Sequence, residues 1–160
     1  MFFVLGIFFL AGLVHCSQKP TKRGEEIIRF HEFVAQINHH ADTLFGQYLT
    51  EKFVFTDTRG QILTGKERVI MGWQQLFRFF PDYKIAVESV SFENNAVLAF
   101  GYVSGTYMGL QSEADENHWK TPAAWKVSFN EKGEITEWKE YGDTRILHEI
   151  IRSNLPETDF

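Results

Sequence analysis

The sequence predicts an α+β fold in which N-terminal helices are packed in a curved antiparallel sheet. The first half of the chain shows mainly helical periodicity, whereas the second half shows alternation of apolar and polar residues, with turn residues between the alternating segments. Helices followed by a run of antiparallel strands are typical of this class, because the sheet covers its apolar face with the helices. The 160 residues are enough for one domain with its own core.

Three helices are predicted in the first half of the chain. Apolar residues recur at steps of three and four over residues 25–38. Asp42 is expected to cap a second, short helix. Thr64 and Glu67 have the spacing of a capping box and predict the start of a third helix, which ends before Pro81.

Strands dominate the rest of the chain. Six segments have strand character: residues 53–57, 61–63, 83–93, 96–108, 122–130 and 135–142. Asn94-Asn95 and the segment around Gly133 predict tight turns. Residues 109–120 are expected to form either an exposed connection or a lid over a pocket mouth. A helical pattern over residues 143–155 predicts a terminal helix that caps the domain.

The last strand carries the feature that most directly suggests function. Trp138 and Glu140 are two residues apart and therefore share one face, while Ile135 and Tyr141 point to the other. A carboxylate beside a tryptophan is unusual on a buried face unless that face lines a pocket. We therefore expect Glu140 to lie where ligand recognition or chemistry takes place.

Composition excludes several functional classes. The chain is 44% hydrophobic and 16% aromatic, which favours a packed core or an apolar cavity over disorder. Its net charge of −5 and the lack of a basic cluster argue against nucleic-acid binding. The histidines are not spaced four residues apart, and the single cysteine completes no ligand set, so neither a metal nor a cofactor is expected.

The N-terminus is typical of an exported protein. Residues 2–14 form an apolar, uncharged stretch that is too short to span a bilayer, so residues 1–16 are predicted to be a signal peptide. The segment that ends in Cys16 resembles a bacterial lipoprotein cleavage box, with Cys16 as the lipidated residue and residues 17–24 as a tether to the cell envelope. The alternative is an apolar N-terminus that packs on the domain.

The order of motifs resembles a known family. Thr64-Gly65-Lys66-Glu67 precede a helix that ends at Phe80-Pro81-Asp82, and Gly133-Glu134-Ile135 lead to Trp138, Tyr141 and Asp143. This arrangement resembles the SnoaL-like branch of the nuclear transport factor 2 superfamily, over about residues 25–143 of a domain that we expect to span 25–155. The resemblance implies a cone-shaped α+β barrel with an apolar cavity, often a homodimer through the outer sheet face.

The resemblance also suggests site residues. The base of ketosteroid isomerases falls on Asp57, but their two oxyanion donors fall on Phe33 and Trp125, which cannot replace them. The acid/base carboxylate of SnoaL-type cyclases falls on Glu140. Lys126 stands where those cyclases have a histidine. Epoxide hydrolases of this superfamily need an Arg-x-Asp pattern on the same strand, and residues 123–127 offer only Lys126 as a basic residue.

Candidate site residues follow from these two arguments. The catalytic candidates are Glu140, Asp57 and Lys126, and the ligand-binding candidates are Tyr102, Trp138, Phe33, Trp125 and Tyr141. Three structural alternatives remain open: Lys126 and Glu140 form an ion pair on the outer face, Asp57 forms a turn, or Tyr141 and Asp143 only close the last strand and cap the terminal helix.

Three functions are compatible with these residues. The leading prediction is a protein that binds a small apolar or polyketide-like molecule without turnover, because its aromatic interior accompanies incomplete catalytic sets. The second is an acid/base enzyme that acts as an isomerase, cyclase, dehydratase or hydrolase through Glu140 and Asp57. The third is a homodimeric scaffold whose interior is filled by side chains.

Overall fold

The computed structural model of the protein describes residues 22–108 and 117–154. It contains, in order, α1 (Lys22–Asn38), the 3-10 helix η1 (Asp42–Gln47), β1 (Leu49–Thr56), β2 (Ile62–Thr64), α2 (Lys66–Phe79), β3 (Lys84–Glu93), β4 (Ala96–Thr106), β5 (His118–Phe129), β6 (Ile135–Gly142) and α3 (Arg145–Ser153). The predicted signal peptide with Cys16, and most of the predicted connection 109–120, lie outside the described residues. Helix α1 begins inside the segment predicted to be a tether.

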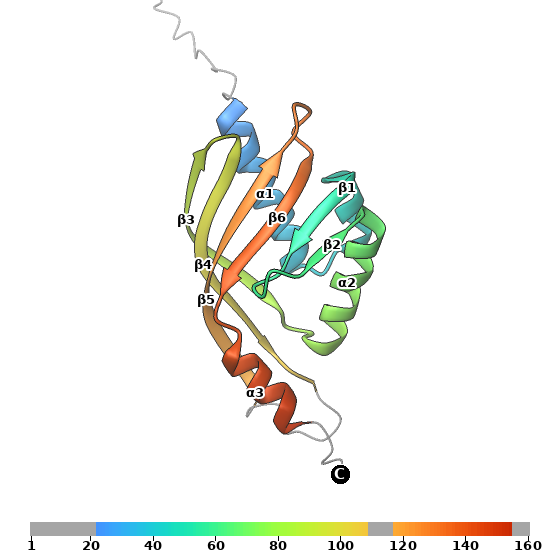
Figure 1. Ribbon diagram of the computed structural model, residues 1–160, viewed down its shortest axis with the longest axis vertical. Coiled ribbons are helices and arrows are strands. Elements are labelled where there is room, and N and C mark those ends of the chain that lie inside the picture. Colours follow the sequence, from blue (N-terminus) through green and yellow to red (C-terminus); the bar gives the residue numbers. More distant parts are fainter. Residues whose placement is uncertain (1–21, 109–116, 155–160) are drawn as a thin grey trace, which may run out of the picture.

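The strands form one six-stranded sheet in the order β2-β1-β6-β5-β4-β3 (Figure 1). Neighbouring strands are antiparallel except β1 and β6, which run in the same direction. The α+β class is therefore confirmed, but the sheet is mixed and open instead of wholly antiparallel. The exception arises because β3 to β6 alternate in direction and the last of them returns beside β1.

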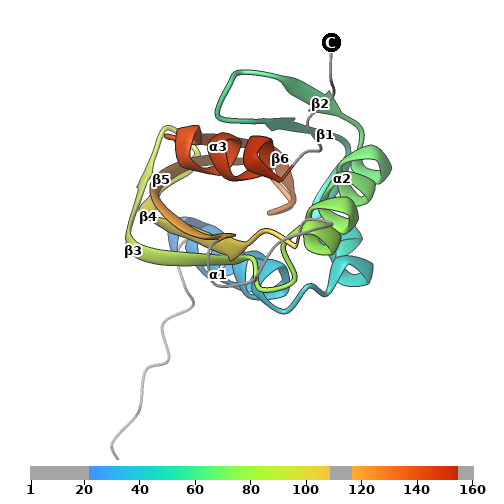
Figure 2. The ribbon, with the colours of Figure 1, turned by 90° about the horizontal axis from the view of Figure 1, so that it is seen from below.

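The sheet curves around the helices to give the cone expected from the resemblance. Figure 2 shows the sheet as an arc, with α1 and α2 closing the ring and α3 lying across one end. In the described part of the chain, no helix is both long and apolar enough to cross a bilayer.

An aromatic cluster between α1 and the β5–β6 hairpin forms the centre of the core. The ring of Trp138 is stacked on Phe30 at 5.8 Å and lies edge-on to Phe33 at 5.7 Å. Trp125 lies 6.5 Å from Trp138, and all four side chains are at most 1% exposed. Losing a buried ring of this size typically costs about 3–5 kcal/mol, so this cluster anchors β6 firmly.

Two predicted caps are wrong. Residue 64 belongs to β2, and Gly65 caps α2 with a φ of 101° and no side-chain hydrogen bond. The amide of Gly65 donates to the carbonyl of Phe53, so this segment is held by strand pairing instead of a capping box. Asp42 does not cap a helix either. It is the first residue of η1 and accepts a hydrogen bond from Gln74.

Strand β5 begins at His118, four residues earlier than predicted. The expectation that Pro122 starts the strand is wrong because residues 118–122 pair with β4, whereas pairing with β6 begins only at Ala123. A residue without an N–H is tolerated where a strand has one neighbour. Trp119 therefore lies in the sheet and not in a loop.

Candidate functional site

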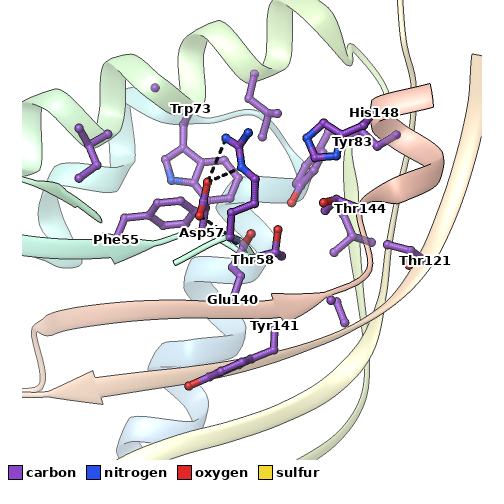
Figure 3. Close-up of a pocket in the computed structure, with 18 of the residues that line it drawn as sticks. Phe55, Asp57, Thr58, Trp73, Tyr83, Thr121, Glu140, Tyr141, Thr144 and His148 are labelled. Atoms are coloured by element: carbon purple, nitrogen blue, oxygen red, sulfur yellow. Dashed lines mark hydrogen bonds and ion pairs between the residues drawn. The ribbon is translucent and has the colours of Figure 1, made fainter. Parts of the chain in front are cut away.

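A cavity of about 340 Å³ opens between α2, the ends of β1, β5 and β6, and α3 (Figure 3). Its lining residues are Phe55, Asp57, Thr58, Arg59, Leu63, Val69, Gly72, Trp73, Leu76, Tyr83, Val103, Trp119, Thr121, Ala123, Glu140, Tyr141, Gly142, Thr144, Leu147 and His148. Most of these side chains are apolar or aromatic, as is usual for small-molecule sites. A cavity of this size argues against an interior filled by side chains.

Glu140 projects into this cavity from β6. Strand alternation places it on the same face as Trp138, and across the ladder it lies opposite Trp125. The indole Nε1–H of Trp138 donates to Glu140 Oε1 at 3.2 Å. The Glu140 side chain is half-buried because it faces the cavity, while protein surrounds it on its other sides.

The environment of Glu140 disfavours its charged form. The pKa of Glu140 is raised from 4.5 to about 7, mainly by burial and to a smaller extent by the nearby negative charge of Asp57. The hydrogen bond from Trp138 lowers the pKa of Glu140 and so opposes this rise. The Trp125 N–H also approaches the carboxyl and lowers its pKa. The Trp125 contact falls short of a well-formed hydrogen bond, so we assign it the weaker role. A carboxyl with this pKa can both donate and accept a proton near neutrality.

Asp57 lies at the cavity edge and also forms a turn. Its Oδ1 accepts backbone hydrogen bonds from Arg59 at 2.9 Å and Gln61 at 2.8 Å. Its Oδ2 is paired with the Arg59 guanidinium at 3.3 Å. The turn role expected as an alternative is therefore present, and both oxygens of Asp57 have partners. Glu140 is the more available carboxyl.

Tyr83, the residue just before β3, also lines the cavity, although no sequence pattern predicted it as a site residue. This side chain is 5% exposed, and its hydroxyl makes no hydrogen bond with the described residues. Burial, with a contribution from the charge of Glu140, raises the pKa of Tyr83 well above 10. Tyr83 therefore stays a neutral O–H donor at any physiological pH, facing the same cavity as Glu140.

Three rings form one wall of the cavity. Phe55 and Trp73 lie edge to face at 6.1 Å, and Trp73 and Tyr83 do so at 5.8 Å. Trp119 contributes a further ring from β5. Sequence periodicity assigned Trp73 only to the apolar face of a helix, because a core residue and a cavity-lining residue on a helix have the same spacing.

Helix α3 borders the cavity and supplies Leu147 and His148, with Thr144 from the turn before it (Figure 3). Asn154, which follows the helix, donates a hydrogen bond from its Nδ2 to Oδ1 of Asn117, the residue just before β5, at 3.0 Å. The sequence predicted this helix as a cap but gave no indication that His148 faces a site.

Several predicted site residues lie away from the cavity. Lys126 is exposed on the outer face opposite Lys139, so the structure does not bring it to Glu140, and the expected ion pair between Lys126 and Glu140 is wrong. Tyr102 also lies outside, with Lys120 Nζ 4.3 Å from its ring centroid. The structure places Phe33, Trp125 and Trp138 in the core behind Glu140 instead of among the lining residues.

Tyr141 borders the cavity, but its ring projects from the opposite side of β6 to Glu140 (Figure 3). The side chain is 51% exposed. Asp143 is not the N-cap of α3, which is Thr144, although Asp143 Oδ1 accepts the amide of Arg145 at 3.0 Å. Residues 22–108 and 117–154 contain no group of three or more metal-ligating side chains.

Comparisons with known proteins agree with this architecture. The SnoaL-like domain family matches residues 30–138. The chain belongs to the SnoaL-like domain family. Among curated proteins, none matches this SnoaL-like chain in a sequence search.

Solved structures share the fold of this SnoaL-like protein at low identity. A candidate SnoaL-like polyketide cyclase from Jannaschia sp. CCS1 has 18% identity and a TM-score of 0.71, covering 87% of this chain and 99% of its own. An epoxide hydrolase from M. tuberculosis has 13% identity and a TM-score of 0.67, with coverage of 84% and 94%. A nuclear transport factor 2-like protein of unknown function from Cytophaga hutchinsonii has 20% identity and a TM-score of 0.61, with coverage of 82% and 98%. These likenesses establish the fold alone.

Proposed function

We propose that the cavity binds a small, largely apolar molecule and that Glu140 exchanges a proton with it. The observation that carries this proposal is the position of Glu140, a carboxyl with a pKa of about 7 at an apolar cavity, held from behind by Trp138. General acid/base catalysis is most effective when the pKa of the group lies near the working pH.

The surrounding residues support acid/base chemistry. The aromatic wall excludes water from the bound molecule, which strengthens hydrogen bonds inside the cavity. Tyr83 offers an O–H to a ligand oxygen, and Asp57 keeps the pKa of Glu140 raised. Isomerisation, cyclisation, dehydration and hydrolysis all need such a proton transfer, so the reaction type within this group stays a prediction. Lys126 has no part in this proposal.

The test begins with native mass spectrometry of protein purified from its source, which identifies a co-purified ligand. Turnover and binding of that ligand are then compared in Glu140→Gln and in a control, Glu137→Gln, which changes a half-buried side chain paired with Lys139 on the same strand. We expect Glu140→Gln to lower kcat by about 100-fold or more while ligand affinity changes little. If Glu140→Gln turns the ligand over as fast as the wild-type protein does, the proposal is contradicted. If the wild-type protein binds the ligand tightly but does not turn it over, the protein is a binding protein.

The outer sheet face favours a second function, that of a homodimeric subunit. Phe100, Ala124 and Tyr141 form one row across β4, β5 and β6, and Phe100 and Tyr141 are 56% and 51% exposed. Exposed aromatic rows of this kind favour association. A homodimer through this face predicts that Phe100→Glu shifts the mass in solution from dimer to monomer. A monomeric wild-type protein contradicts it.

Export to the cell envelope with a lipid on Cys16 stays a proposal from the sequence. Growth with a labelled lipid precursor tests it. Incorporation that is lost in Cys16→Ser supports a lipoprotein, and no incorporation leaves export without an anchor.

A further inference from the structure

We propose that the cavity selects ligands that carry a cationic ammonium group, which contacts Glu140 and the aromatic wall. This inference deepens the proposed function and rests on it only in requiring that a small molecule enters the cavity. It assigns a charge to that molecule, which neither the family nor the fold determines.

Glu140 has no cationic partner in the part of the chain that the structure describes. Among the ion pairs of residues 22–108 and 117–154, none includes this carboxyl. Its polar contacts are the neutral indoles of Trp138 and Trp125, and the charge that shifts its pKa is the negative charge of Asp57. An ionised Glu140 therefore faces the cavity without charge compensation, and a cation that enters the cavity supplies it.

The basic groups at the cavity do not reach Glu140. Arg59 is committed to Asp57 Oδ2 through its Nε at 3.4 Å and its Nη2 at 3.3 Å, and its side chain is 56% exposed. His148 lines the cavity from α3, and among the described residues it forms no ion pair with Glu140. Tyr83 is neutral. When Glu140 is ionised, the site has an excess of negative charge, because the two carboxylates of Asp57 and Glu140 outnumber the single guanidinium of Arg59.

The walls suit an ammonium group. Phe55, Trp73, Tyr83 and Trp119 all line the cavity, and the first three meet nearly at right angles, with interplanar angles of 72° and 74°. The three rings therefore differ in orientation along the cavity wall. The face of an aromatic ring attracts a cation through its quadrupole, and quaternary ammonium ligands are recognised by aromatic cages of this type. The overall charge of −5 also favours the approach of cations.

Binding of a permanent cation is linked to the protonation of Glu140. The cation favours the ionised carboxylate, so affinity is low at acidic pH, rises as pH increases through about 7 and then levels off. A carboxyl with that pKa is about 3% ionised at pH 5.5 and about 97% ionised at pH 8.5, which gives about a 30-fold difference in affinity if only the ionised form binds.

The test compares benzyltrimethylammonium with its neutral isostere neopentylbenzene, by calorimetry or by tryptophan fluorescence, between pH 5.5 and 8.5. At pH 8.5 we expect Glu140→Gln to weaken binding of the cation by about 10-fold or more and to change binding of the isostere by less than about 3-fold. The control Glu137→Gln should leave both affinities unchanged. His148→Gln should keep the pH dependence, because Glu140 is its source.

Three results overturn the inference: equal effects of Glu140→Gln on the two probes, a pH dependence that disappears in His148→Gln, or no binding of the cation to the wild-type protein. If the isostere binds and the cation does not, the cavity still takes small molecules and the proposed function stands. If neither probe binds, the proposed function is judged separately, from the turnover of the co-purified ligand.

Discussion

Glu140 should destabilise the folded protein at neutral and alkaline pH. Its pKa is about 7 in the folded chain, against an ordinary value of 4.5 that we take for the unfolded chain. Between these values the folded state binds more protons than the unfolded state, so the free energy of unfolding falls as pH rises. The contribution of protonated Glu140 is complete below pH 4.5 and is lost as pH rises through about 7.

The structure sets the size of this effect. The difference between 4.5 and about 7 corresponds to about 3 kcal/mol, and water that enters the cavity reduces it toward about 2 kcal/mol. Glu140→Gln keeps the shape of the side chain but cannot ionise. The free energy of unfolding of the variant minus that of wild type should therefore be about 2 kcal/mol larger at pH 8.5 than at pH 4. Any fixed cost of the substitution is the same at both pH values and cancels in this comparison.

Urea unfolding of both proteins at the two pH values measures this difference directly. Glu137→Gln serves as the reference for loss of a carboxylate from the same strand. The change in its unfolding free energy between the two pH values, relative to wild type, is subtracted from that of Glu140→Gln. A stability difference between wild type and Glu140→Gln that is identical at pH 4 and pH 8.5 would refute the argument that burial keeps this carboxyl neutral.

Three further changes test the site and the sheet. Trp138→Phe removes the indole donor and should raise the pKa of Glu140 above about 7, as measured by carboxyl NMR, with a loss of stability of about 1–3 kcal/mol. Asp57→Asn keeps an acceptor for the turn but removes the neighbouring charge, so the pKa of Glu140 should fall below about 7 in the same titration. Gly101→Ala places a Cβ 1.9 Å from a carbonyl oxygen of β3 and should cost about 3 kcal/mol or more in urea unfolding, whereas Gly46→Ala meets no atom within 4 Å and should cost less than about 0.5 kcal/mol.

Each of these has its own control and its own contrary result. Phe30→Leu weakens the same core cluster as Trp138→Phe without removing a donor, so it should lower stability and leave the titration of Glu140 in place. An unchanged titration in Trp138→Phe means that the hydrogen bond does not act on the carboxyl. A rise in the pKa of Glu140 in Asp57→Asn contradicts the assigned sign of the interaction. Equal stability of the two glycine variants contradicts the close approach of β3 and β4.

Local patterns in the sequence determined the α+β class and the most informative strand. The predicted bounds 135–142 match β6, and Trp138 and Glu140 project to the same side because alternation along a strand depends only on neighbouring residues. The same alternation opposes a site role for Lys126, which follows Trp125 and precedes Val127, and the structure places Lys126 outside. Resemblance alone suggested Lys126, so the local pattern was the better guide at this position.

Only the tertiary structure decided which residues share the cavity with Glu140. Tyr83, Trp73 and His148 come from three different elements, and their convergence depends on how α2, β3 and α3 pack on the sheet. Helical spacing marks the apolar face of α2 without showing that part of this face borders a cavity. The raised pKa of Glu140 likewise requires the burial that these elements create together, which no window of sequence contains.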